Sequence, residues 1–199
     1  NRGDGTFTDV TDERMAVIRR YSFQAIMLDF DRDGALDIYV ACDAQQNLLY
    51  RNAGGGRFEE LSLGSGAATD GAGREQASMG VAAGDVDDDG RLDLFVTNFS
   101  HESNCLYRNL GVPQTLFGDV TRAARLEEGS RLTLGWGASF ADYDNDGDLD
   151  LMYANGHLYP GVERTVPETT YAQHVALMRN EGDGRFVEVT SVAGEVLRP

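Results

Sequence analysis

A nine-residue acidic pattern occurs three times in this chain of 199 residues. Each copy has the form D-x-D-x-D-G-x-L-D, and the copies occupy residues 29–37, 85–93 and 142–150. Their starting positions differ by 56 and 57 residues (85 − 29 and 142 − 85). Self-similarity at a fixed period of this length is typical of repeat architectures, in which each repeat is one supersecondary unit. The chain is therefore expected to fold as consecutive copies of one unit.

Each copy has the chemistry of a calcium-binding loop. Calcium takes 6–8 oxygen ligands, and carboxylates at positions 1, 3 and 5 of a tight loop can converge on one point. Glycine at position 6 permits the positive-φ turn, and position 7 offers a backbone carbonyl. The predicted ligands at positions 1, 3, 5, 7 and 9 are Asp29, Asp31, Asp33, Ala35 and Asp37 in the first loop, Asp85, Asp87, Asp89, Arg91 and Asp93 in the second, and Asp142, Asp144, Asp146, Asp148 and Asp150 in the third.

Position 9 is expected to close the loop because the glutamate that an EF-hand carries at position 12 is replaced here. Position 12 holds Val40, Val96 and Tyr153. The residues after position 9 form short apolar runs rich in strand-forming side chains, which indicates buried strands instead of an exiting helix. Each loop should therefore join two strands, and the chain should hold about three calcium ions.

Two other interpretations of the loops stay open. Aspartate and glycine are ordinary turn residues, so each copy could be a solvated acidic turn. Magnesium is a weaker candidate because it favours rigid octahedral sites and keeps its waters. Four carboxylates within nine residues nevertheless repel one another unless a cation neutralises them, which favours a metal site.

A second motif, N-x-G-x-G-x-F, recurs out of phase with the first. Asparagine and glycine supply the left-handed conformations that a tight hairpin needs, and the residues on both sides read as strands. The copies lie at 1–7, 52–58 and 180–186, with a longer variant at 109–117. One unit is then a strand of small residues, the Asp loop, a second strand, a third strand, this turn and a fourth strand.

Four antiparallel strands in every repeat are typical of a β-propeller blade. The predicted fold class is all-β: a propeller segment of about three four-stranded antiparallel blades with a leading outer strand. The leading strand is expected at 7–11 and the blades at about 23–62, 76–121 and 133–190, within a single segment 1–199. Because propellers close with about 4–8 blades, we expect further blades or a partner chain to complete the ring.

The charge balance excludes several classes of partner. The chain has 17 basic against 33 acidic residues, a net charge of −16, and nucleic acids need a basic surface. It has no apolar run of about 18 residues, so we expect no membrane insertion. The first six residues are unlike a signal peptide, which we expect to be absent from this segment. Cys42 and Cys105 fit no metal-binding spacing and fall in different strands of the repeat, which disfavours a disulfide.

These residues resemble the FG-GAP/VCBS repeats of integrin-α-like propellers, and more narrowly the ASPIC/UnbV group, which includes the cartilage acidic protein relatives. The segments 135–150, 154–160 and 179–186 carry the resemblance. It implies a calcium-stabilised propeller that is secreted, periplasmic or on the cell surface and acts in adhesion or recognition of a protein or glycan. It also implies metal ligands at positions 1, 3, 5 and 9. The chain differs from the group in having too few repeats for a ring and in lacking its C-terminal domain.

The segment 156–173 is an insertion relative to the other repeats. Long loops on a rigid scaffold often carry function, so this segment is either a recognition surface or a packed cover of the channel mouth. An alternative function is a propeller lyase or hydrolase in which His157 or His174 acts with a carboxylate. Because no catalytic or cofactor-binding motif is present, we predict that the chain is not an enzyme, without catalytic or cofactor-binding residues.

Overall fold

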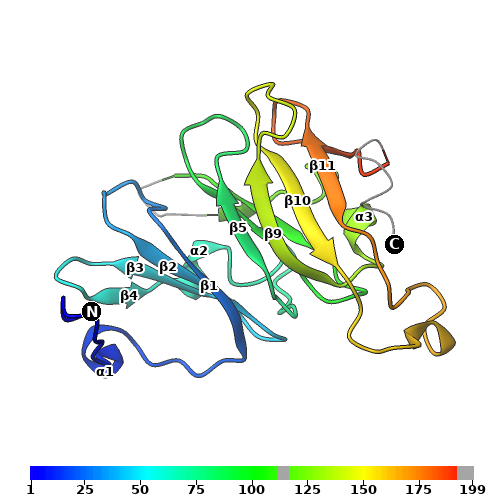
Figure 1. Ribbon diagram of the computed structural model, residues 1–199. Coiled ribbons are helices and arrows are strands. Elements are labelled where there is room, and N and C mark those ends of the chain that lie inside the picture. The colour runs from blue at the N-terminus through cyan, green and yellow to red at the C-terminus, as the bar shows by residue number, and fades with distance from the viewer. Residues whose placement is uncertain (112–116, 192–199) are drawn as a thin grey trace.

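The computed structural model describes residues 1–111 and 117–191 (Figure 1). Within these residues it forms three four-stranded antiparallel sheets in which the strand order follows the chain order, with only short helices between them. The predicted three-blade, all-β propeller segment is confirmed. The longer turn at 109–117 runs through 112–116, and the end of the segment covers 192–199, both of which lie outside the described residues.

The first sheet consists of β1 (Ser22–Leu28), β2 (Asp37–Cys42), β3 (Leu48–Asn52) and β4 (Phe58–Glu60). The second consists of β5 (Val81–Gly84), β6 (Asp93–Val96), β7 (Cys105–Asn109) and β8 (Phe117–Asp119). The third consists of β9 (Gly135–Ala141), β10 (Asp150–Asn155), β11 (Ala176–Asn180) and β12 (Phe186–Glu188). The connections contain α1 (Thr11–Arg14), α2 (Ser62–Ser65), α3 (Glu127–Ser130) and a 3-10 helix at Val162–Arg164.

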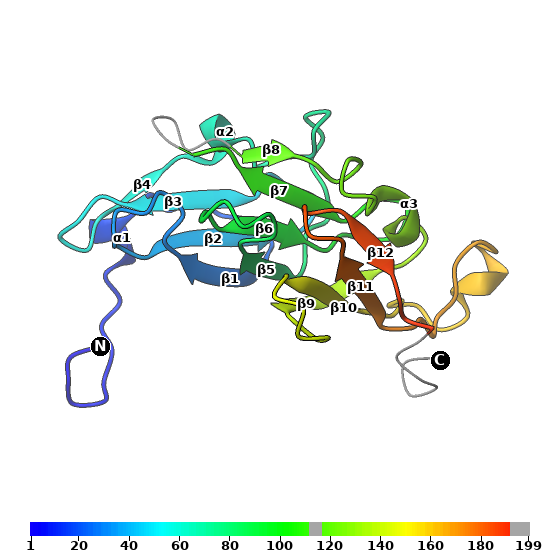
Figure 2. The same cartoon turned by 90° about the horizontal axis from the view of Figure 1, so that it is seen from above.

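The first strands of the three sheets lie next to one another. β5 contacts both β1 and β9, and Figure 2 shows these strands on one side of the molecule, with β4 and β8 on the other. The predicted small residues allow this close approach. A Cβ atom on Gly80, just before β5, would lie 1.8 Å from the carbonyl oxygen of Trp136 in β9. A larger residue at this position would push the second and third sheets apart.

The middle sheet is buried on both faces because its residues alternate between two cores. In β6, Leu94 and Val96 pack toward the first sheet, whereas Phe95 packs toward the third. All four residues of β6 are buried. This two-sided burial explains why the strand reads as a continuous apolar run in the sequence.

The predicted leading strand at 7–11 is wrong. Residues 7–10 have no regular structure, and α1 begins at Thr11. A fourth strand forms by hydrogen bonding to the third strand of the same blade, as β4 does on β3. Residues 7–10 pair with no strand among the described residues, and Phe7 is 78% exposed.

An asparagine links each blade to the one before it. Asn109, which opens the turn of the second blade, donates from Nδ2 to the Phe30 carbonyl in the first blade at 2.8 Å. Asn180 makes the same bond from the third blade to the Val86 carbonyl in the second, also at 2.8 Å. Both acceptors are position 2 of an Asp loop. The turn motif of one blade therefore holds the acidic loop of its neighbour.

Two further expectations concern cysteines and membranes. Cys42 and Cys105 are both buried and free. Among the described residues, no helix combines the length and apolar composition that crossing a membrane requires.

We predict that Asn109→Ala lowers the free energy of unfolding by about 3 kcal/mol, because it leaves the buried Phe30 carbonyl and the partly buried Leu92 carbonyl without their donor. Asn52→Ala is the matched control. Asn52 opens the turn of the first blade and bonds only within that blade, to Leu36 and Gly54. Urea denaturation measures both, and equal losses would contradict the role assigned to the inter-blade bond.

Candidate metal centre

Each acidic loop joins the first and second strands of a sheet, as expected. The three loops follow β1, β5 and β9, and the loops after β5 and β9 project from the same end of the molecule (Figure 1). The strand pair on either side fixes the distance between the two ends of each loop. In the first sheet, for example, Leu28 pairs with Asp37 directly across the ladder.

The structure brings three carboxylates together in each loop. In every group the ligand oxygens lie within 4.8 Å of one another. The groups are Asp29, Asp31 and Asp33 in the first loop, Asp85, Asp87 and Asp93 in the second, and Asp142, Asp144 and Asp146 in the third. Oxygen atoms at this separation can share one cation as common ligands.

The backbone of each loop is shaped by its first aspartate. The two oxygens of Asp29 accept the N–H groups of Asp33 and Gly34 at 3.1 and 3.0 Å, and the other two loops repeat both bonds. Glycine at position 6 has φ between 82° and 103° in the three loops, as the sequence predicts. Position 4 also has positive φ, and its residues are Arg32, Asp88 and Asn145.

The aspartate at position 9 is the most buried residue of each loop. Asp37, Asp93 and Asp150 are at most 1% exposed. In Asp93, Oδ2 accepts the N–H of Val86 at 3.1 Å and Oδ1 accepts the N–H of Asn109 at 2.8 Å. The other loops have the same pair of bonds. Position 9 therefore ties the loop to the turn between the third and fourth strands.

The carboxylate groups contain only part of the predicted ligand set. Asp93 belongs to the carboxylate group of its loop, whereas Asp37 and Asp150 lie outside theirs. Asp89 also lies outside its group, because it pairs with Arg91. At position 7, the N–H groups of Ala35, Arg91 and Asp148 donate to the aspartate at position 5. Their carbonyls stay predicted ligands.

Burial and mutual repulsion disfavour ionised carboxylates here. Burial, with a smaller contribution from the charges of Asp87 and Asp89, raises the pKa of Asp93 to about 6. Burial also raises the pKa of Asp37, and both burial and neighbouring aspartates raise that of Asp144. In addition, Asp87 Oδ1 is buried without a hydrogen-bond partner. A set of oxygen donors that is costly to ionise and incompletely hydrogen bonded fits a hard divalent cation.

The acidic loops fall within segments that match a known family of repeats. A model of the FG-GAP-like repeat matches residues 29–96 and again residues 85–153, so the matches begin at the first and second acidic loops. The chain belongs to the FG-GAP-like repeat family. The matched units run from one acidic loop to the next, which is the period seen in the three sheets.

The chain is also similar to cartilage acidic protein 1 from three vertebrates. The chain is 29% identical over 171 residues to the protein of Homo sapiens, 28% over 165 residues to that of Xenopus tropicalis and 28% over 171 residues to that of Mus musculus. Each alignment covers 78% of this chain and 24% of the relative. The chain thus spans about a quarter of the length of these relatives.

The insertion 156–173 folds back on the third blade. The N–H of His157 donates to the Tyr171 carbonyl at 3.0 Å, and Thr169 donates to the Leu132 carbonyl at 2.8 Å. The two histidines considered for catalysis have separate partners. His157 lies 3.3 Å from Ser100 Oγ, whereas His174 pairs with Glu188 at 3.2 Å.

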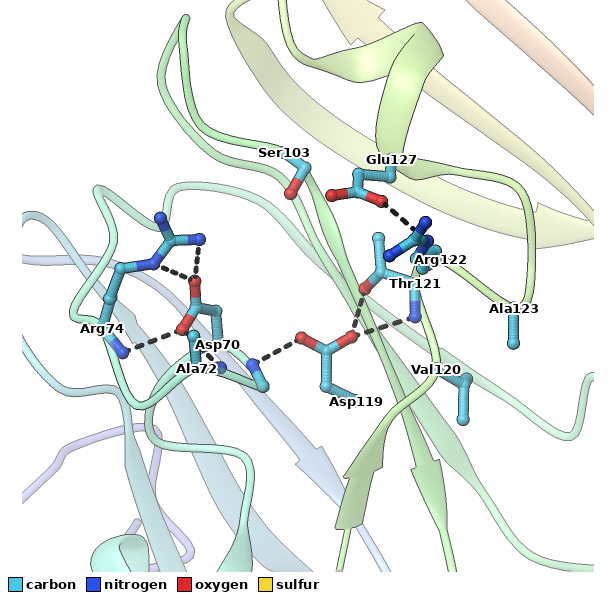
Figure 3. A pocket seen from close by; sticks show the side chains of 11 residues that line it. Asp70, Ala72, Arg74, Ser103, Asp119, Val120, Thr121, Arg122, Ala123 and Glu127 are labelled. Atoms are coloured by element: carbon cyan, nitrogen blue, oxygen red, sulfur yellow. Dashed lines mark hydrogen bonds and ion pairs between the residues drawn. The ribbon is translucent and has the colours of Figure 1, made fainter.

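A cavity of about 680 Å³ lies away from the acidic loops, beside β8 and the connection before α3 (Figure 3). Its carboxylates already have protein partners. Asp70 pairs with Arg74 at 2.7 Å, and Asp119 accepts the N–H groups of Gly71 and Thr121. These carboxylates organise the walls of the cavity.

Sequence reasoning missed two groups of residues around the loops. The asparagine of the turn motif was recognised only as a turn former, although it holds both its own loop and that of the neighbouring blade. The pairing of Arg108 with Asp87 was also missed. The recurrence of Arg-Asn before every internal turn, at 51–52, 108–109 and 179–180, is the signal that could have directed attention to both.

The raised pKa of Asp93 makes a prediction about pH for the protein in EDTA. Because the folded-state pKa of about 6 exceeds the ordinary value of 3.8, this group contributes stability below about pH 4 that is lost as pH rises through 6. We therefore expect the stability of the wild type relative to Asp93→Asn to fall by on the order of 2 kcal/mol between about pH 4 and pH 7. Chemical denaturation across this range tests it. Parallel pH profiles for the two proteins would contradict the assignment.

Proposed function

We propose that this chain is a calcium-binding repeat module of an extracellular propeller that acts in adhesion or in recognition of a protein or glycan. The observation that carries the proposal is that every loop gathers three carboxylates and contains a buried aspartate that ties the loop to the turn after the third strand; in the second loop this aspartate, Asp93, is one of the three. About three calcium ions would bind, one in each loop. A bound ion would neutralise the carboxylate charges and coordinate their oxygens, which would hold each loop in one conformation.

Calcium suits this donor set better than other common ions. The grouped atoms are all carboxylate oxygens, which hard cations prefer, and the described residues of the triads include neither cysteine nor histidine. Calcium accepts flexible oxygen coordination, whereas magnesium demands near-octahedral geometry and keeps its waters. Three calcium ions would also reduce the net charge from −16 to −10 (−16 + 6), lowering the self-repulsion of the chain.

The proposed location follows from the proposed ion. Loops of modest affinity are filled by the millimolar calcium found outside cells, so we place the module in a secreted, periplasmic or cell-surface protein. Its ring would be completed by further blades or by a partner chain. The calcium ions would then act as structural ties that keep the blades in register.

The insertion is the proposed recognition surface. Its side chains include Leu158, Tyr159 and Tyr171, which are 49%, 63% and 46% exposed. Exposed tyrosines give large contact areas at low entropic cost, and they are common in recognition surfaces. The hydrogen bonds that anchor the insertion to the third blade would hold these side chains in place for a protein or glycan partner.

The arrangement of His157 does not support its part in the alternative lyase or hydrolase. Nδ1 of His157 accepts the N–H of Tyr159 at 3.2 Å. In the neutral ring Nε2 therefore carries the proton and donates it to Ser100 Oγ, so the histidine is not poised to remove the serine proton. His157 and Ser100 are both buried, which agrees with a structural contact.

We predict that Asp31→Asn and Asp144→Asn lower the melting temperature in excess calcium and have little effect in EDTA. Each removes one carboxylate of a triad, and an occupied site contributes about 2.7 kcal/mol at a hundredfold excess of ion over Kd. Asp88→Asn is the matched control, since Asp88 is exposed outside the triads and the third loop already carries asparagine at this position. Thermal melts with and without calcium provide the measurement. Equal destabilisation in both conditions would refute the metal role of that loop.

A further inference from the structure

The three acidic loops differ in the cations that surround them. In the second loop, Arg108 Nε lies 3.0 Å from Asp87 Oδ2, and Arg91 pairs with Asp89. No ion pair to a triad carboxylate is present in the first or third loop among the described residues. The second loop therefore has a guanidinium group beside one of the three carboxylates that would bind the ion.

The sequence around Arg108 explains this pairing. Each internal turn is preceded by an arginine, and in the first and third blades that arginine has a local acid. Arg51 pairs with Glu59 directly across the ladder, at 2.5 Å. Arg179 pairs with Glu181 two residues later, at 2.7 Å.

The second blade has neither of these acids. The residue across the ladder from Arg108 is Gly118, and the residue two positions later is Leu110. Arg108 therefore contacts the acidic loop of its own blade. It also donates to the Asp183 carbonyl, in the turn of the third blade, at 3.4 Å. The guanidinium is held between two blades instead of along its own strand.

The Arg108–Asp87 pair is also less exposed than its counterparts. The side chains of Arg108 and Asp87 are 29% and 15% exposed, against 41% and 52% for Arg51 and Glu59. Ion pairs that are shielded from water are stronger and less screened by salt. The contact with Asp87 therefore competes more effectively with an incoming cation than an exposed pair would.

We propose that Arg108 makes the second loop the weakest of the three calcium sites. This inference rests on the proposed function, that the acidic loops bind calcium. An ion that enters this loop must either displace the guanidinium from Asp87 or bind beside a positive charge with one carboxylate already engaged. The first and third loops present their triads without this competition.

Two variants of the full chain test the proposal by calorimetric titration with calcium. Arg108→Gln removes the competing charge. Leu110→Glu retains Arg108 but gives it the local acid that Arg179 has in Glu181, at a position that is 57% exposed. Both should strengthen calcium binding at the second loop by about tenfold, which corresponds to about 1.4 kcal/mol for the lost competition of one partly buried ion pair.

Arg51→Gln is the matched control, because it removes the equivalent arginine of a blade where that residue pairs with Glu59. It should leave all calcium affinities unchanged. Addition of Asp87→Asn to each protein identifies the second-loop site, since only that binding event should weaken. Thermal melts in EDTA verify that each variant folds.

The outcomes separate this inference from the proposed function. A weak Asp87-dependent site that strengthens in both Arg108→Gln and Leu110→Glu supports the inference. If calcium binds but the Asp87-dependent site has the same affinity in wild type and both variants, the inference that Arg108 competes with calcium is wrong. The proposed calcium-binding function is then unaffected. If folded protein and variants give no binding at any loop, the proposed function itself fails.

Discussion

The rest of the structure depends on the two hydrogen bonds that the buried aspartate at position 9 of each loop accepts from the backbone. Asp93 has both oxygens occupied by backbone N–H groups, one from its own loop and one from a turn 16 residues later. A buried carboxylate is costly unless such bonds satisfy it, and the raised pKa of Asp93 shows that the cost is only partly offset. A bound cation would supply the missing compensation, which is why the structural tie and the proposed metal site lie together.

The turn asparagines extend this interaction from one blade to the next. The backbone N–H of Asn109 donates to Asp93, which holds Asn109 in place. Its side chain donates to the Phe30 carbonyl in the first acidic loop. A loop, its turn and the neighbouring loop are therefore connected by hydrogen bonds between buried groups. Calcium binding in one loop would stabilise the packing of adjacent blades as well as its own strands. The apolar cores on both faces of the middle sheet depend on that packing.

Much of the candidate site could be predicted from the sequence because the loop is a local structure. Glycine at position 6 and the aspartate at position 1 shape the backbone within nine residues, and both behave as expected. The role of the aspartate at position 9 was predicted only in part, because it was expected to be a metal ligand and not a tie to another turn. Its role as the tie to Asn52, Asn109 or Asn180 depends on a turn elsewhere in the chain. The pairing of Arg108 with Asp87 likewise depends on Gly118 and Leu110, which only strand register brings beside it.

The sequence by itself determined the repeat, the acidic loops, the hairpin turns and the identity of the strands, because these follow from short-range backbone preferences and from side-chain periodicity. The tertiary structure decided which carboxylates converge and which become buried ties, because that depends on groups contributed by other strands and other blades. It also decided the state of residues 7–11. A strand requires a hydrogen-bonded neighbour, and the local pattern of residues cannot provide one.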